Sequence, residues 1–227
     1  MRCHVSFTPA EAVSAPFGIV IDVMRATSTI VQALASGYRR VLSCAEIDDA
    51  RALKEELGDA AITGGEREAQ RIEGFEAGAS PREFLEPRAE TLILSTTNGT
   101  RAIVSAVDGC GEVVLGSLLN LDAVAALARE RGEDVVLLCA DYKDAFAIDD
   151  AYCAGRIVAL LDADRTDAAV AAEAIAARYP NAVDGINART YGPPGLEEDI
   201  AWVARESVLD VVPRFARMVG PAADVML

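Results

Sequence analysis

Histidine is almost absent from this chain of 227 residues, which contains only His4. A Ser-His-Asp triad and a histidine phosphatase each need a histidine at the reacting centre, and a His-rich metal site needs several. A single histidine near the first residue therefore argues against all three. Lysine is also scarce, since Lys54 and Lys143 are the only ones, so arginine supplies nearly all the positive charge.

Cysteine occurs without the pairing that a disulfide framework or a zinc site requires. The five cysteines are Cys3, Cys44, Cys110, Cys139 and Cys153, and no two of them form a C-x-x-C pair. An odd, scattered set predicts reduced thiols in a cytoplasmic protein. The C-x-x-x-x-x-R loop of cysteine phosphatases is also missing, because no cysteine is followed by an arginine at that spacing.

Long apolar runs are missing too. No segment has the roughly 18 uninterrupted apolar residues of a membrane span, and the first residues lack an apolar core of signal-peptide length. We therefore expect no membrane partner and a cytoplasmic location. Hydrophobic residues still make up 52% of the chain, which is enough for a substantial core and too many for a disordered chain.

Negative charge dominates, because 36 Asp and Glu residues oppose 21 Lys and Arg residues and leave a formal charge of −15. Nucleic-acid affinity comes largely from basic side chains that displace counterions at phosphates, and anionic membranes repel an acidic surface. The composition thus argues against nucleic-acid and membrane partners. A small anionic ligand held by local arginines stays compatible with it.

Short aliphatic runs alternate with helical patterns, which is typical of parallel strands joined by crossover helices. The predicted strands are 18–23, 40–44, 60–63, 91–95, 112–115 and 134–139, and the predicted helices between them are 27–36, 46–57, 100–107 and 120–131. Strands that are apolar throughout need cover on both faces. The sequence therefore predicts an α/β fold, a three-layer sandwich around a largely parallel sheet.

The last third of the chain has a mostly helical pattern. Helices are predicted at 149–161, 167–179 and 196–206, with an exposed Gly-, Asn- and Pro-rich loop at 181–195 and a short apolar run at 209–212. We expect 1–227 to form one unit, with two subdomains of about 1–90 and 91–227 as an open alternative. A homodimer is expected only from the general frequency of such assemblies.

Polar residues follow the first predicted strand, at the edge of a parallel sheet where ligands bind. Asp22 ends this strand, Arg25 follows, and Thr27 and Ser28 open the next helix. A carboxylate, a guanidinium and a helix N-terminus together suit a metal or phosphate site. An ordinary capped helix with a solvated Asp22 explains the same residues, and the sequence leaves both interpretations open.

The segment after the predicted strand 91–95 contains more groups that bind oxyanions than the segment after the first strand does. It reads Thr-Thr-Asn-Gly-Thr-Arg-Ala at 96–102, and we interpret Thr97, Asn98, Gly99, Thr100 and Arg101 as anion-binding residues. A plain turn would need the Asn-Gly pair but not the flanking threonines and arginine. The pattern is neither a P-loop nor a G-x-G-x-x-G dinucleotide motif.

The segments that follow two further predicted strands each allow a structural and a functional interpretation. Ser117 and Asn120 bracket a helix start, and a simple N-cap explains them slightly better than a ligand does. Asp149 and Asp150 begin another helix, where they favour its dipole or supply oxygen ligands for Mg²⁺. Glu66 follows two glycines at the start of the long polar loop 63–81, a kind of loop that often forms an active-site wall.

These segments together resemble the 2-phosphosulfolactate phosphatase family. The shared motifs are Asp-Val-x-Arg-Ala-Thr-Ser at 22–28, Gly-Glu-Arg at 65–67, Gly-Phe-x-x-Gly-x-Ser-Pro at 74–81, Thr-Thr-Asn-Gly-Thr-Arg-Ala at 96–102, Gly-Ser-x-x-Asn at 116–120 and the acidic pair with Cys-Ala-Gly at 149–155. They occur in order over residues 18–161. The resemblance implies a Mg²⁺-dependent phosphatase that converts (2R)-2-phospho-3-sulfolactate to sulfolactate and phosphate, a step of coenzyme M biosynthesis.

Carried over position by position, the resemblance implies roles for particular residues. Asp22, Glu66 and Asp150 are the expected catalytic residues, and Asp149 joins these three as an expected metal ligand. The expected substrate-binding residues are Arg25, Thr27, Ser28, Thr97, Asn98, Gly99, Thr100, Arg101, Ser117 and Asn120.

The chain departs from the family pattern at Ala79, where an asparagine is expected, at Asp141, where a glycine is usual, and at Asp149, where a glutamate is more familiar. The first two changes motivate an alternative, a non-catalytic sensor that binds a small organophosphate or sulfonate. The four intact carboxylates favour the enzyme, because a pure anion binder has no need of them without a cation.

Overall fold

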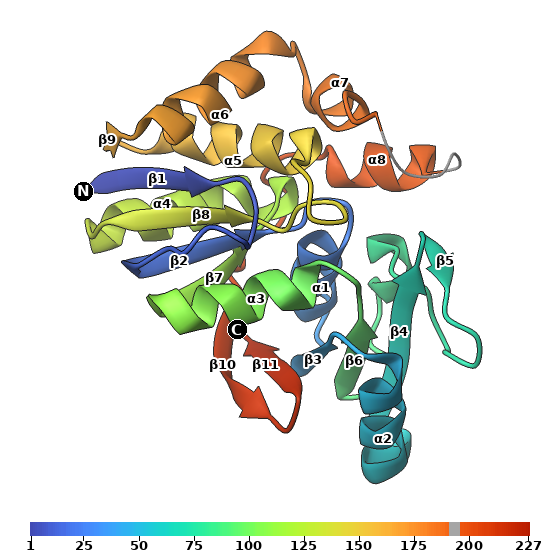
Figure 1. Cartoon of the computed structure of the whole chain (residues 1–227). Helices are drawn as coiled ribbons and strands as arrows, with labels where there is room; N and C mark the ends of the chain where they lie inside the picture. Colours follow the sequence, from blue (N-terminus) through green and yellow to red (C-terminus); the bar gives the residue numbers. More distant parts are fainter. Residues whose placement is uncertain (191–195) are drawn as a thin grey trace.

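The computed structural model describes residues 1–190 and 196–227 and confirms the α/β fold class (Figure 1). One eleven-stranded sheet has the order β5-β4-β6-β3-β11-β10-β7-β2-β8-β1-β9. Its strands are β1 (Arg2–Ser6), β2 (Ala15–Ile21), β3 (Arg40–Cys44), β4 (Ala61–Arg67), β5 (Gln70–Arg71), β6 (Thr91–Ser95), β7 (Cys110–Gly116), β8 (Val135–Cys139), β9 (Asp164–Arg165), β10 (Arg214–Val219) and β11 (Ala222–Met226).

Helices cover both faces of this sheet. They are α1 (Ala26–Ala35), α2 (Ile47–Leu57), α3 (Gly99–Gly109), α4 (Leu121–Arg131), α5 (Ile148–Leu160), α6 (Asp167–Arg178), α7 (Ala182–Asn187) and α8 (Glu197–Val203), with short 3-10 turns at Gly58–Ala60, Pro81–Phe84 and Leu118–Asn120. Buried side chains of α4, α5 and α6 form one core with strands β1, β2 and β8. Those of α1 and α3 form a second core on the other face. No helix in the described ranges is long and apolar enough to cross a membrane.

The sheet consists of two parallel groups joined by the C-terminal hairpin. Strands β4, β6 and β3 are parallel to one another, as are β7, β2, β8, β1 and β9. Between the groups, β11 is antiparallel to β3, β10 to β11, and β7 to β10. Three successive antiparallel pairings make the two groups run in opposite directions. Figure 1 shows the first group standing steeply to the second, with the ends of β2, β4, β6 and β8 near the centre.

Most predicted elements are present with shifts of one to three residues, and the bounds of β3 and β6 are those expected. Strand β1 and the hairpin β10–β11 were not predicted. The hairpin has only half-exposed and exposed side chains on β10, and it is held by pairing with β3, which lies far away in sequence. The loop expected at 181–195 contains α7, and its residues 191–195 lie outside the described part of the chain.

Candidate active site

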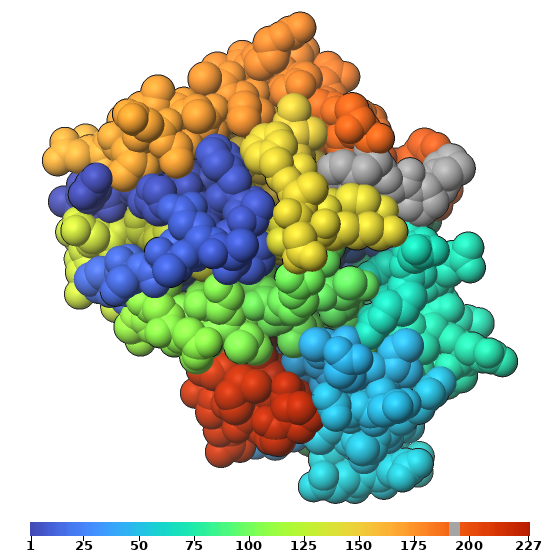
Figure 2. All heavy atoms as spheres, viewed as in Figure 1, coloured from blue at the N-terminus to red at the C-terminus, as the bar shows by residue number. Residues whose placement is uncertain are grey.

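A pocket of about 270 Å³ lies where the ends of the two strand groups meet. It is lined by Asp22, Met24, Arg25, Ala26, Glu66, Arg67, Glu68, Ala69, Ala79, Thr96, Thr97, Asn98, Asp141, Tyr142, Lys143, Asp149, Asp150, Arg189 and Leu196. Most of these residues lie at the end of β4, follow β2, β4, β6 or β8, or begin α5, whereas Ala79, Arg189 and Leu196 come from other segments. The ends of four strands thus supply most of one cavity. In Figure 2 the segment that follows β8 (yellow) lies on the surface between the N-terminal segment (blue) and α3 (green).

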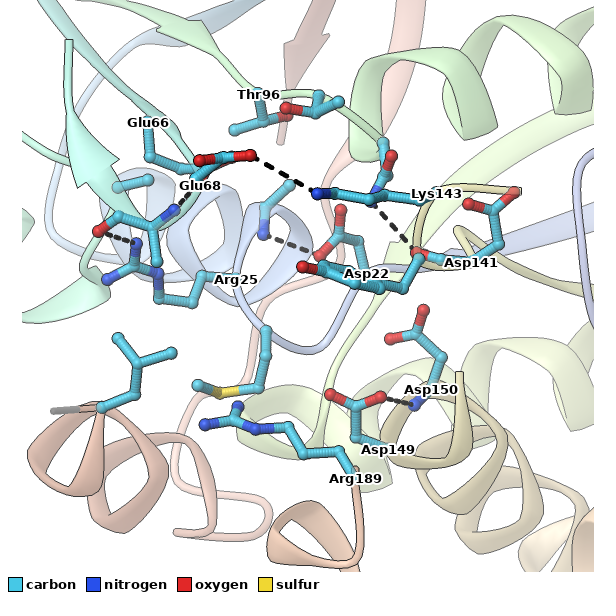
Figure 3. A pocket seen from close by; sticks show the side chains of 18 of the residues that line it. Asp22, Arg25, Glu66, Glu68, Thr96, Asp141, Lys143, Asp149, Asp150 and Arg189 are labelled. Atoms are coloured by element: carbon cyan, nitrogen blue, oxygen red, sulfur yellow. Dashed lines mark hydrogen bonds and ion pairs between the residues drawn. The ribbon is translucent and has the colours of Figure 1, made fainter. Parts of the chain in front are cut away.

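Asp22 lies in the middle of this pocket, directly after the buried strand β2 (Figure 3). Its side chain is almost fully buried, and Oδ1 accepts a hydrogen bond from the backbone N–H of Ala26 at 3.2 Å. Burial raises the pKa of Asp22 to about 7; the Ala26 N–H lowers it, and the nearby charges of Glu66 and Asp149 raise it further. The carboxylate therefore sits in an environment that disfavours its negative charge unless a cation is near.

The acidic pair begins α5 and lies on the next wall of the pocket. Asp149 Oδ1 accepts a hydrogen bond from the backbone N–H of Asp150 at 3.1 Å, and Asp150 Oδ1 accepts one from the N–H of Val23 at 2.8 Å. Burial, followed by the charges of Asp149 and Asp22, raises the pKa of Asp150 well above its ordinary value. Asp150 thus fixes the turn after β2, and the pair adds two buried carboxylates to the cavity.

Glu66 reaches the pocket from the opposite group of strands. It lies in the last part of β4, and its Oε2 accepts a hydrogen bond from the N–H of Ala69 at 2.6 Å. The glycine before it is required by packing, because a Cβ at Gly65 would lie 2.5 Å from the backbone oxygen of Ser95 on β6. The glycine run that precedes Glu66 therefore lets β4 and β6 approach and places the carboxylate at their shared edge.

The segment between β6 and α3 contains two buried polar atoms without a partner in the described structure. They are Thr96 Oγ1 and Asn98 Oδ1, whereas the Asn98 amide nitrogen donates to the backbone oxygen of Asp141 at 3.1 Å. No described side chain caps the N-terminus of α3, so its first N–H groups are also available. Unsatisfied buried groups are costly, and a bound ligand is a ready explanation for them.

Arg25 is held in place by a buried ion pair. Its Nη1 lies 2.7 Å from Asp199 Oδ2, and both side chains are less than a tenth exposed. Asp199 also accepts a hydrogen bond from Ser80 at 2.5 Å, and Arg25 Nη2 donates to the backbone oxygen of Ala69 at 3.4 Å. The sequence predicted Arg25 at the site but not its partner on α8, which lies 174 positions away.

Several expected ligand-binding side chains point elsewhere. Thr27 bonds the backbone of Asp22, Ser28 donates to Val23 O, Thr100 bonds Ser43, and Arg101 pairs with Asp144 at the surface. None of these four lines the pocket, and neither does Gly99, although it starts α3 beside it.

Ser117 and Asn120 lie outside the pocket as well. They form a reciprocal capping box on the turn Leu118–Asn120, and the Asn120 amide donates to the backbone oxygens of Leu115 and Val211. The pair therefore has the structural role that the simpler interpretation of the sequence gave it.

The pocket also contains residues that the sequence alone did not single out. They are Arg67, Glu68, Lys143 and Arg189, together with Asp141, which the sequence marks only as a departure from the family pattern. Asp141 has a positive φ of 67°, a conformation that favours glycine, and this explains why glycine suits the position. Burial raises the pKa of Asp141. Arg189 lies just beyond α7 and carried no recognisable motif.

The oxygen-bearing side chains of the pocket are of the type that binds a hard divalent cation. Asp22, Glu66, Asp149 and Asp150 offer carboxylate oxygens, and Asn98 offers an unpartnered amide oxygen. Within the described ranges, however, no three acidic, cysteine or histidine side chains already surround a common point. The types of side chain fit Mg²⁺, but the side chains would have to move closer together to bind the ion.

The fold and the pocket define an α/β protein whose pocket combines carboxylates, basic side chains and unpartnered polar atoms, a combination that suits phosphoryl transfer. A family model described as 2-phosphosulpholactate phosphatase matches residues 5–217 of the chain. The chain therefore belongs to this phosphatase family, as the motifs at the strand exits predicted.

Named relatives span nearly the whole chain. A probable 2-phosphosulfolactate phosphatase of Clostridium acetobutylicum is 35% identical over 219 residues, which cover 90% of this chain and 92% of the relative. Proteins of the same name from Thermotoga maritima and Clostridium novyi are 35% and 32% identical, covering 92% and 87% of this chain and 93% and 88% of those relatives.

Proposed function

We propose that this enzyme hydrolyses (2R)-2-phospho-3-sulfolactate with the help of Mg²⁺. The observation that supports this most directly is the pair of unsatisfied atoms, Thr96 Oγ1 and Asn98 Oδ1, beside the uncapped start of α3. A hydroxyl and free N–H groups at a helix N-terminus suit a phosphoryl oxygen, and an amide oxygen suits a cation. Phosphatase family membership supports the same reaction class.

The balance of charge explains why a cation is part of the proposal. Six carboxylates line the pocket, namely Asp22, Glu66, Glu68, Asp141, Asp149 and Asp150, against the basic side chains of Arg25, Arg67, Lys143 and Arg189. Such a pocket would repel a multiply charged phosphate ester. We assign Glu66, Asp149, Asp150 and Asn98 to hold Mg²⁺, with Asp22 beside them. The ion supplies Lewis-acid stabilisation of charge on the phosphoryl group.

The remaining steps belong to the protein. The Thr96 hydroxyl and the first N–H groups of α3 bind phosphoryl oxygens, and Arg25, fixed by Asp199, stabilises the charge that develops on them. Asp22 Oδ2 faces the start of α3, so it orients the attacking water and accepts its proton. As the water oxygen bonds to phosphorus, the bond between phosphorus and the ester oxygen breaks. The proton that Asp22 accepted from the water balances the proton that the ester oxygen gains, and this oxygen leaves as the hydroxyl of sulfolactate.

Because the pocket takes residues from both strand groups, we propose that 1–227 works as one catalytic unit. Strands β1 and β2 belong to the same group as β7 and β8, so the strand groups do not divide the chain at residue 90.

Phosphate release tests the proposed function. Purified protein is incubated with phosphosulfolactate and a panel of small phosphate esters, with Mg²⁺ and with EDTA. We expect release from phosphosulfolactate that EDTA abolishes, and strong loss of release in Asp22→Asn and Glu66→Gln. Full activity in both variants would refute the site assignment. Binding without release from any ester would instead support the non-catalytic sensor.

A further inference from the structure

The basic side chains of the pocket are not equally available to a ligand. Both terminal nitrogens of Arg67 are engaged, since they donate to the backbone oxygens of Glu66, Ala45 and Ser95 and to the Ser95 hydroxyl. This side chain ties β4 to β6 and to the turn after β3. Arg67 therefore supports the wall of the pocket, and its two terminal nitrogens have no N–H left for a substrate group.

Two other basic side chains are partly engaged. Arg25 is neutralised by the buried Asp199 at 2.7 Å, so it presents one edge of its guanidinium at most. Lys143 lies 3.4 Å from Glu68, and both side chains are largely exposed, so this pair is weak. Lys143 sits at the solvent side of the pocket and offers a hydrated point charge.

Arg189 differs from both. It follows α7, is half-buried, and lines the pocket, and it has no hydrogen-bond or ion-pair partner among the described residues. In Figure 3, Arg189 and Thr96 lie on opposite sides of the cavity, with Asp22 between them. A ligand with its phosphoryl group at Thr96 would therefore extend past Asp22 toward Arg189.

The proposed substrate has a group that matches this position. In 2-phospho-3-sulfolactate the sulfur lies one bond farther from phosphorus than the carboxylate carbon does. A planar guanidinium binds such an oxyanion through two parallel hydrogen bonds. We propose that Arg189 binds the sulfonate and is the residue that selects phosphate esters that carry a sulfonate group. This inference rests on the proposed function and adds the residue that determines specificity.

The test compares three substrates that differ in one group each. They are phosphosulfolactate, 2-phospholactate, which lacks the sulfonate, and 2-phosphooxypropane-1-sulfonate, which lacks the carboxylate. In Arg189→Met we expect KM to rise about 10- to 100-fold for the two sulfonates, the loss of one charge-assisted contact, with kcat nearly unchanged. The kinetic constants for 2-phospholactate should hardly change, and Arg189→Lys should restore part of the affinity.

Two matched variants make the result specific. Lys143→Met removes the other available charge of the pocket, and Arg178→Met removes an arginine at the end of α6 that does not line it. Neither should change the preference for sulfonates. The inference is overturned if Arg189→Met keeps the wild-type preference, if Lys143→Met loses it, or if Arg189→Met weakens 2-phospholactate equally. If the wild-type enzyme releases no phosphate from any of the three esters, the proposed function fails and the inference with it.

Discussion

Gly99 packs closely against Asp22 beside the pocket, because a Cβ at position 99 would be 2.9 Å from Asp22 Oδ2 and 2.3 Å from the Cβ of Ala26. The first residue of α3 is thus packed against the end of β2 and the first residue of α1. Only a residue without a side chain permits this approach. The contact places the uncapped N–H groups of α3 beside the carboxylate that is proposed to handle water.

Gly99→Ala should therefore damage both the fold and the reaction. The added methyl forces α3 away from Asp22 and Ala26, and overpacking of this kind costs about 1–3 kcal/mol. We expect a lower free energy of unfolding in urea and a large fall in kcat for the protein that remains folded. Asp108→Ala, an exposed change on the same helix, is the control. Wild-type kcat in Gly99→Ala would show that this contact does not position the site.

Asp199→Asn should unfold the protein more easily and weaken substrate binding. The substitution keeps the shape of the side chain but leaves the Arg25 guanidinium buried without its counterion, and breaking a buried pair costs about 3 kcal/mol. Urea denaturation and KM measure the two effects. The neighbouring Glu198 pairs with Arg82 at the surface, so Glu198→Gln should cost less than about 1 kcal/mol. Equal losses in the two variants would contradict a special role for Asp199.

Asn120→Ala should separate stability from catalysis. The side chain is fully buried and bonds three backbone groups. Its Oδ1 accepts a hydrogen bond from the N–H of Ser117, and its Nδ2 donates to Leu115 O and Val211 O. Its loss should cost about 2–4 kcal/mol, because these groups stay buried without partners. KM and kcat of the folded variant should match the wild type, measured at a temperature where it is fully folded. A selective rise in KM would restore Asn120 to the list of substrate-binding residues.

The sequence predicted the parallel elements well because their signals are local. Aliphatic runs such as Thr91–Ser95 bury every side chain, and only a covered strand explains such a pattern. The hairpin β10–β11 lacks that signal. Its place between β3 and β7 depends on pairings with residues about 100 to 180 positions away, which no short pattern encodes.

In the candidate site, too, local features could be predicted from the sequence and long-range contacts could not. Asp22 and Asp150 follow β2 and β8, whose ends parallel pairing brings together. Glu66 lies at the end of β4 in the other strand group, which runs in the opposite direction, so its place in the same pocket depends on the C-terminal hairpin between the groups. Side-chain direction is a different matter: Thr27 and Ser28 have the expected positions, but their hydroxyls bond the backbone before α1. Arg189 reaches the pocket only because α7 packs against α5, and this contact has no signature in the residues around it.

The carboxylate of Glu76 makes the stability of the fold depend on pH in the acid range. Burial alone would raise its pKa, but hydrogen bonds from the Thr63 hydroxyl, from Lys54 and from the Thr63 N–H outweigh it and lower the pKa from 4.5 to about 2. The Thr63 N–H lies 2.8 Å from Oε2, and Lys54 Nζ lies 2.9 Å from Oε1. The carboxylate thereby fastens the loop after β4 to the strand itself.

A carboxyl group with a lowered pKa in the folded state stabilises the protein while it is ionised. This contribution is complete above pH 4.5 and is lost as the pH falls through about 2. Glu76→Gln should thus lower Tm at pH 7, and its deficit against the wild type should shrink steadily between pH 4.5 and 2. Thermal unfolding at several pH values measures this, with the exposed Glu73→Gln as control. A deficit that stays constant down to pH 2 would mean that Glu76 acts through its shape rather than its charge.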